Sequence, residues 1–63
     1  MTSYIVWNAN KTEGFVTTDK QLAYEIRKGA DTNCYYANGD LARVARSFCE
    51  EHQNEDCTIQ EIN

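Results

Sequence analysis

The sequence predicts a small α+β domain in which two helices lie on one face of a mainly antiparallel sheet. Three observations predict this class. β-branched and aromatic residues flank a polar turn near the N-terminus, two segments of helical periodicity follow, and the last residues have the composition of a strand. The expected order is β-β-α-(β)-α-β, in which the bracketed strand is a short one near residues 33–37. The 63 residues form a single domain, 1–63.

The N-terminal part predicts a β-hairpin. Residues 4–7 read Tyr-Ile-Val-Trp and residues 14–17 read Gly-Phe-Val-Thr, with the polar stretch 8–13 between them. Two runs of this kind around a polar, glycine-containing loop are typical of paired antiparallel strands.

The first helix is expected to begin after Thr18. Thr18 and Gln21 match a capping box, and Asp19 complements the helix dipole in the first turn. Gly29 is expected to end this helix as a left-handed cap. The predicted apolar stripe consists of Leu22, Ala23 and Ile26.

The second helix has the strongest pattern in the chain, with Asp40 as its cap after an Asn38-Gly39 turn. Its predicted buried face consists of Leu41, Val44, Ala45, Phe48, Cys49 and His52. Residues 57–62 then predict a final strand, which completes the sheet.

The first strand is apolar on both sides, unlike a strand with one solvated face. We therefore expect the sheet face without helices to carry aromatic or apolar groups, chiefly Tyr4 and Trp7, and to serve as an interface. Tyr35 and Tyr36 of the short strand are further candidates for this interface. The alternative is that these aromatic residues are half-exposed without any role, as single apolar side chains often are.

The charge favours a protein partner over a nucleic acid. Ten acidic and six basic residues give a net charge of −4, and the basic residues are scattered along the chain. Nucleic-acid binding draws its affinity from lysine and arginine side chains that neutralise phosphates, so this composition disfavours it.

The chemistry-bearing residues do not match an active site. Cys34, Cys49, Cys57 and His52 could supply a zinc site, but the sequence lacks the C-x2-4-C spacing of the common ones. Cys49 is more simply a core residue, and the carboxylate pairs at 50–51 and 55–56 match a solvated surface. We expect neither catalysis nor a cofactor; a small metal-stabilised structural domain is the alternative.

The start of the chain does not match a secretory signal, and the longest apolar run, residues 4–7, is far shorter than the roughly 20 residues of a membrane span. Three irregularly spaced cysteines also differ from a secreted disulfide framework. We expect a cytoplasmic protein with no membrane partner.

Residues 4–7, the stretch 11–17 and the first predicted helix resemble the N-terminal hybrid-binding (viroplasmin-like) domain of type 1 ribonucleases H. That resemblance covers residues 4–48 in pattern. It implies a module that binds RNA–DNA hybrid or double-stranded RNA, with Lys11, Trp7, Tyr35 and Tyr36 as candidates. Arg43 is a further basic candidate. The acidic charge and a third strand without lysine or arginine depart from the family.

In size, acidity and lack of catalytic motifs, the whole chain resembles the small early-region proteins of lambdoid phages and prophages. This resemblance implies a non-enzymatic protein that binds a host or phage protein in the bacterial cytoplasm and alters its activity. A homodimer is compatible with each of these hypotheses.

Overall fold

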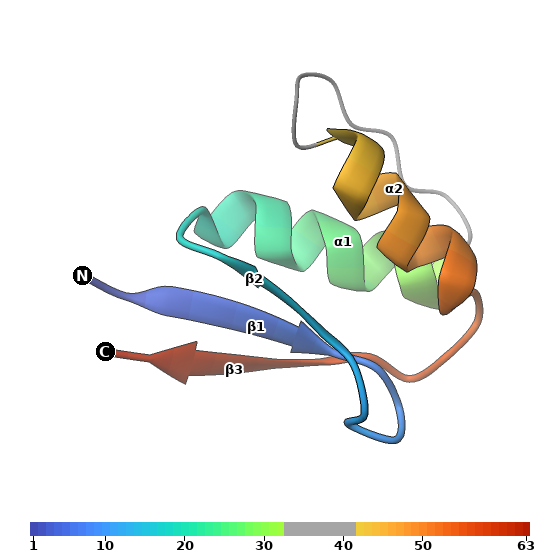
Figure 1. Cartoon of the computed structure of the whole chain (residues 1–63), viewed down its shortest axis with the longest axis horizontal. Helices are drawn as coiled ribbons and strands as arrows, with labels where there is room; N and C mark the ends of the chain where they lie inside the picture. Colours follow the sequence, from blue (N-terminus) through green and yellow to red (C-terminus); the bar gives the residue numbers. More distant parts are fainter. Residues whose placement is uncertain (33–41) are drawn as a thin grey trace.

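The computed structural model describes residues 1–32 and 42–63. The strands are β1 (Ser3–Trp7), β2 (Gly14–Thr17) and β3 (Thr58–Ile62), and the helices are α1 (Lys20–Thr32) and α2 (Ala42–Glu51). The strands form one antiparallel sheet in the order β2-β1-β3, with both helices on one side of it (Figure 1). The predicted α+β class is confirmed. The predicted strand near 33–37, the Asn38-Gly39 turn and the Asp40 cap lie outside the described residues.

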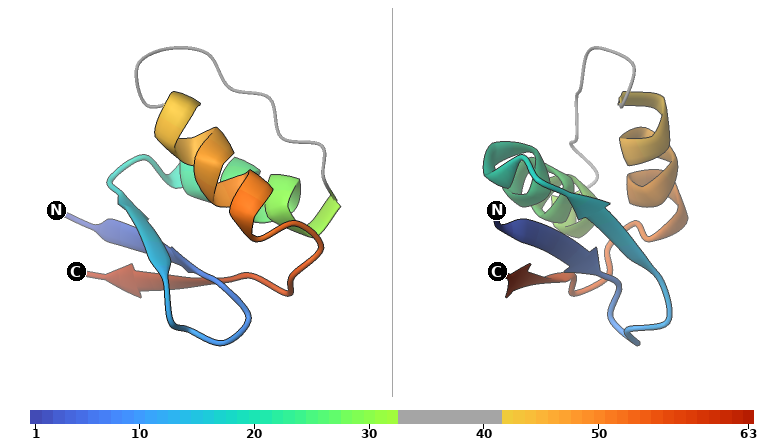
Figure 2. Two further views of the ribbon diagram at one scale, coloured as in Figure 1. Left: turned by 45° about the vertical axis from the view of Figure 1, so that its right-hand side comes forward. Right: turned by 60° about the vertical axis from the view of Figure 1, so that its left-hand side comes forward.

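The core lies between the sheet and α1. Val6 in the central strand is completely buried, and the register places it opposite Phe15 of β2 and Ile59 of β3. Helix α1 contacts all three strands and contributes the fully buried Ile26, whereas α2 lies against α1 (Figure 2). Phe48 of α2 reaches the sheet at Phe15, with the ring centroids 6.2 Å apart. One helix thus covers the sheet directly, and the second packs against the first and reaches β2 through Phe48.

The ends of α1 differ from the prediction. The Asp19 carboxylate accepts a hydrogen bond from the backbone N–H of Leu22 at 3.1 Å, so Asp19 is the N-cap and the predicted cap at Thr18 is wrong. The predicted stop at Gly29 is also wrong, because the helix continues to Thr32. Ala30, one residue beyond the glycine, is completely buried in the core, and this burial stabilises the extra turn.

The buried face of α2 is narrower than predicted. Ala45, Phe48, Cys49 and His52 are buried as expected, but Val44 is 56% exposed. Because α2 packs mainly on one other helix, a residue at the margin of its apolar face stays in solvent. Leu41 lies outside the described residues. Within 1–32 and 42–63, neither helix has the length and hydropathy that a membrane crossing requires.

Candidate functional site

The side of the sheet opposite α1 is a candidate interface, which we call the uncovered face. Side chains alternate along a strand, so the partners of the buried Val6 point to the helices and the residues between them point away. Its members come from all three strands: Ser3, Ile5, Trp7, Gly14, Val16, Thr58, Gln60 and Ile62. None of these residues carries a charge, although a quarter of the chain is charged.

On the uncovered face, the side chain of Trp7 contacts both neighbouring strands. Its indole N–H donates a hydrogen bond to the Gln60 side-chain oxygen of β3 at 2.9 Å. On the other side its ring covers Gly14 of β2, where a Cβ atom would lie 3.1 Å from ring atom Cε3 and 2.8 Å from a methyl group of Ile5. Glycine at this position therefore lets the indole lie flat across the sheet.

The apolar members of the face are accessible to a partner. Val16 is 63% exposed on the edge strand β2, and Ile62 is 44% exposed on the opposite edge. Ile5 and Trp7 are half-buried between them. An antiparallel sheet that meets only water normally carries polar residues along its outer side, whereas this one mixes the polar Ser3, Thr58 and Gln60 with four apolar side chains.

Tyr4 was predicted on the uncovered face, and this placement is wrong. Tyr4 lies on the same side of β1 as Val6 and packs against the core. The alternation along the strand requires this, because Trp7 is three residues away and must point to the opposite side. Tyr35 and Tyr36 lie outside the described residues.

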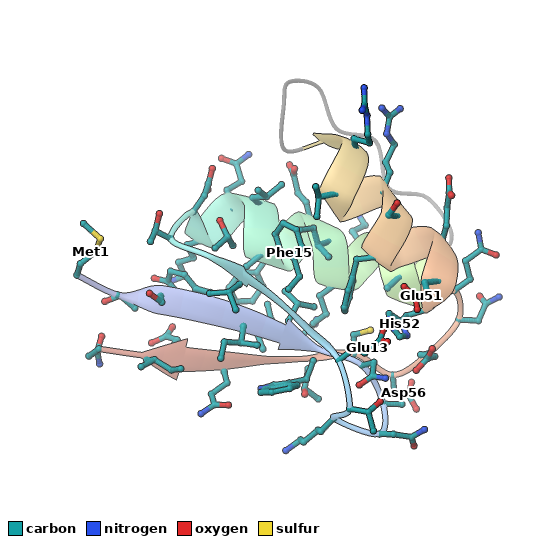
Figure 3. All side chains as sticks on the ribbon, in the orientation of Figure 1. Met1, Glu13, Phe15, Glu51, His52 and Asp56 are labelled. Carbon is teal, nitrogen blue, oxygen red and sulfur yellow. The ribbon has the colours of Figure 1, made fainter. Side chains whose placement is uncertain are left out.

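A second candidate site surrounds His52, just beyond the end of α2. The imidazole is buried, with 7% of its side chain exposed, and each ring nitrogen contacts a carboxylate. Nε2 lies 2.7 Å from Oε2 of Glu13, and Nδ1 lies 2.8 Å from Oε2 of Glu55. Phe48 packs on the ring with a centroid distance of 4.6 Å. Figure 3 shows Glu13, Glu51 and His52 gathered where α2 meets the hairpin loop.

The partners of His52 determine its protonation. Burial alone lowers the pKa of His52, but the hydrogen bonds and negative charges of Glu55 and Glu13 outweigh it, so the pKa is raised above the ordinary 6.5. A doubly protonated ring donates from both nitrogens, which matches two short carboxylate contacts. The site is therefore an ion-pair cluster that ties the hairpin loop to the end of α2.

The hairpin loop is built to hold Glu13 in place. The side-chain oxygen of the buried Asn8 accepts hydrogen bonds from the backbone N–H groups of Thr12 and Glu13, at 2.9 and 3.1 Å. The Asn8 backbone N–H donates in turn to the Glu13 carbonyl. Lys11 closes the loop in the left-handed region, with a φ of 56°. The backbone at Glu13 is thus fixed by one buried asparagine.

Only one of the two contacts of His52 has a signal in the sequence. His52 and Glu55 are three residues apart, a spacing at which side chains meet near a helix end, but Glu55 was interpreted as solvated surface. The structure corrects that interpretation: 30% of the Glu55 side chain is exposed, and Glu55 binds His52. Glu13 is 39 residues away from His52, and no local pattern connects the two.

Within residues 1–32 and 42–63, Cys49, Cys57 and His52 do not come together as a group of metal ligands. Cys49 and Cys57 are both buried in the core cluster, while the nitrogens of His52 face carboxylates. The Cys49 thiol donates to the backbone carbonyl of Ile26 at 3.5 Å. Cys34 lies outside the described residues.

Cys49 is expected to resist thiol reagents in the folded protein. Burial, with smaller effects from Cys57 and Glu50, raises the pKa of Cys49 from 9.0 to about 11, so the reactive thiolate is about a hundredfold scarcer. Mass spectrometry after brief iodoacetamide treatment should find Cys49 unmodified in buffer and modified in denaturant. Rapid labelling of the native protein would contradict this assignment.

The basic residues considered for nucleic-acid binding do not meet. Lys11 is at the tip of the hairpin and Arg43 is in the first turn of α2, and these two ends of the fold lie on opposite sides of the molecule (Figures 1 and 2). Comparison with known protein families, curated proteins and solved structures finds no match to this chain.

Proposed function

We propose that this protein has no catalytic role and acts by binding another protein against its uncovered face. The observation that carries this proposal is the uncharged face of the sheet in an otherwise acidic chain, where apolar side chains come from all three strands: Ile5, Trp7, Val16 and Ile62. Contiguous apolar surface of this kind commonly marks an interaction site. The resemblance to early-region phage proteins supports a host or phage protein in the bacterial cytoplasm as the partner.

The aromatic ring and the lack of charge on the uncovered face indicate the composition of the partner's contact surface. Trp7 offers a large, rigid ring, and rings of this type supply much of the binding energy in protein interfaces. The uncharged surface gives a basic partner no direct attraction, whereas the net charge of −4 still attracts one at longer range. We therefore propose a partner whose contact surface is apolar and whose surroundings are basic.

A matched pair of variants tests this proposal. Val16→Glu places a charge on the uncovered face, and Val44→Glu places the same charge on α2, where valine is similarly exposed. Burying an unpaired carboxylate in the complex costs about 2 kcal/mol or more, so Val16→Glu should bind the partner about 30-fold more weakly. Val44→Glu should bind as the parent does.

The measurement is affinity capture from lysates of an enteric bacterium with and without nuclease treatment, followed by titration of the protein captured after nuclease treatment. Circular dichroism melting must first show that both variants are folded. Equal binding by Val16→Glu and the parent, or failure of the parent to retain any protein, would contradict the proposal. Capture that requires intact nucleic acid would favour the hybrid-binding alternative.

A further inference from the structure

We propose that Glu13, Glu51 and His52 form a binding site for a first-row divalent transition metal such as Zn²⁺. The ligand atoms of these three side chains all lie within 4.8 Å of one another. They come from the hairpin loop and the end of α2, which are distant in sequence. The site shares no residue with the uncovered face, so this proposal is independent of the proposed function.

The orientation of His52 favours metal binding. A metal-bound histidine usually donates its second ring N–H to a carboxylate, which fixes the tautomer and aims the other nitrogen at the metal. Here Nδ1 faces Glu55 at 2.8 Å, and the other oxygen of Glu55 accepts a hydrogen bond from the backbone N–H of Ala9 at 3.3 Å. Glu55 is thus held in the supporting position, and Nε2 points to the remaining carboxylates.

The ligand atoms of the three side chains would need to move only slightly to hold a metal ion. Zinc bonds to nitrogen and oxygen are about 2.0–2.1 Å, so two ligands of a tetrahedral ion lie about 3.3 Å apart. Nε2 and Oε2 of Glu13 are 2.7 Å apart and would have to separate slightly, while Glu51 would approach. Both carboxylates are on exposed residues that can rotate, whereas His52 is buried and stays in place.

Charge and ligand type select the ion. Glu13, Glu51 and Glu55 carry three formal negative charges, and protonated His52 offsets only one of them. A divalent cation that replaces the Nε2 proton would lower the formal net charge of these four side chains from −2 to −1. Imidazole with two carboxylates suits Zn²⁺ and Co²⁺, whereas Mg²⁺ and Ca²⁺ prefer sites made only of oxygen atoms.

The test is a titration of the full chain with Co²⁺, followed by visible absorption and calorimetry. We expect one ion per chain, displaced by Zn²⁺ and not by excess Mg²⁺. The near-ultraviolet charge-transfer band of a cobalt–thiolate bond should be absent, which separates this site from the cysteines. Glu51→Gln and Glu55→Gln should each weaken binding about 10-fold or more.

Glu50→Gln is the matched control, because Glu50 is exposed on the same helix turn but lies outside the site. It should bind Co²⁺ as the parent does. No uptake of Co²⁺ at millimolar concentration, a thiolate band, or equal affinities for Glu51→Gln and Glu50→Gln would each overturn the proposal. Glu50 and Glu51 are exposed, so the fold should survive their substitution. Only 30% of the Glu55 side chain is exposed, so circular dichroism melting must first show that Glu55→Gln is folded.

Discussion

In urea, the Ile26→Ala protein is expected to unfold at a midpoint about 2 M or more below that of the parent. Ile26 of α1 is completely buried in the core cluster, and its backbone carbonyl accepts a hydrogen bond from the Cys49 thiol. Removing this much of a buried side chain costs about 2–5 kcal/mol, because it loses apolar burial and leaves a cavity. A domain of this size has only about 3–5 kcal/mol of stability, so this single substitution should remove a large part of it and lower the urea midpoint accordingly.

The measurement is circular dichroism at increasing urea concentration, with Val44→Ala as the control. Val44 is an apolar helix residue that is 56% exposed, so its truncation should change the free energy of unfolding by about 0.5 kcal/mol or less. If the two variants lost similar stability, the core would not be centred on α1 as the structure has it.

The second large effect is at His52, and it depends on pH. His52→Gln is expected to cost about 2–3 kcal/mol near pH 5.5, because it removes a charged partner from Glu55 and Glu13 in a largely buried site. Glu13 is 51% exposed, so water screens its share and most of the loss comes from Glu55.

The cost of His52→Gln should shrink as the pH rises. The pKa of His52 is higher in the folded protein than its ordinary value of 6.5, so folding favours the protonated ring. The ion pairs stabilise the fold fully below 6.5, and this contribution disappears as the pH rises through the folded-state pKa. Urea titrations of parent and variant, with a chelator present, should therefore converge once the pH exceeds the folded-state pKa of His52. His52 is the only histidine, and a pH-independent difference would mean that its ring is neutral.

The strands and helices followed from the sequence because their signals are local. Two runs of β-branched and aromatic residues around a polar loop predicted the hairpin. The helical spacing of Ala45, Phe48 and Cys49 predicted the buried side of α2. The errors occurred where a distant neighbour decides the outcome. Burial of Ala30 extends α1 past a glycine, and the narrow contact between the helices leaves Val44 in water.

The two candidate sites differed in how far the sequence could predict them. The uncovered face was expected from a strand that is apolar on both sides, although Tyr4 was assigned to the wrong side of it. The carboxylates around His52 could not be assembled in the same way. Glu13 reaches the ring only because the pairing of β1 with both β2 and β3 brings the hairpin loop beside the end of α2.

The position of Trp7 gives the protein an optical reporter on its own binding surface. Trp7 is the only tryptophan in the chain, and it is half-buried on the central strand at one end of the uncovered face. All tryptophan fluorescence of the protein therefore comes from the uncovered face. A partner that covers the face would move the indole into a less polar environment and shift its emission to the blue, whereas unfolding would expose it and shift the emission to the red. Binding and loss of structure thus move a single signal in opposite directions, without a label.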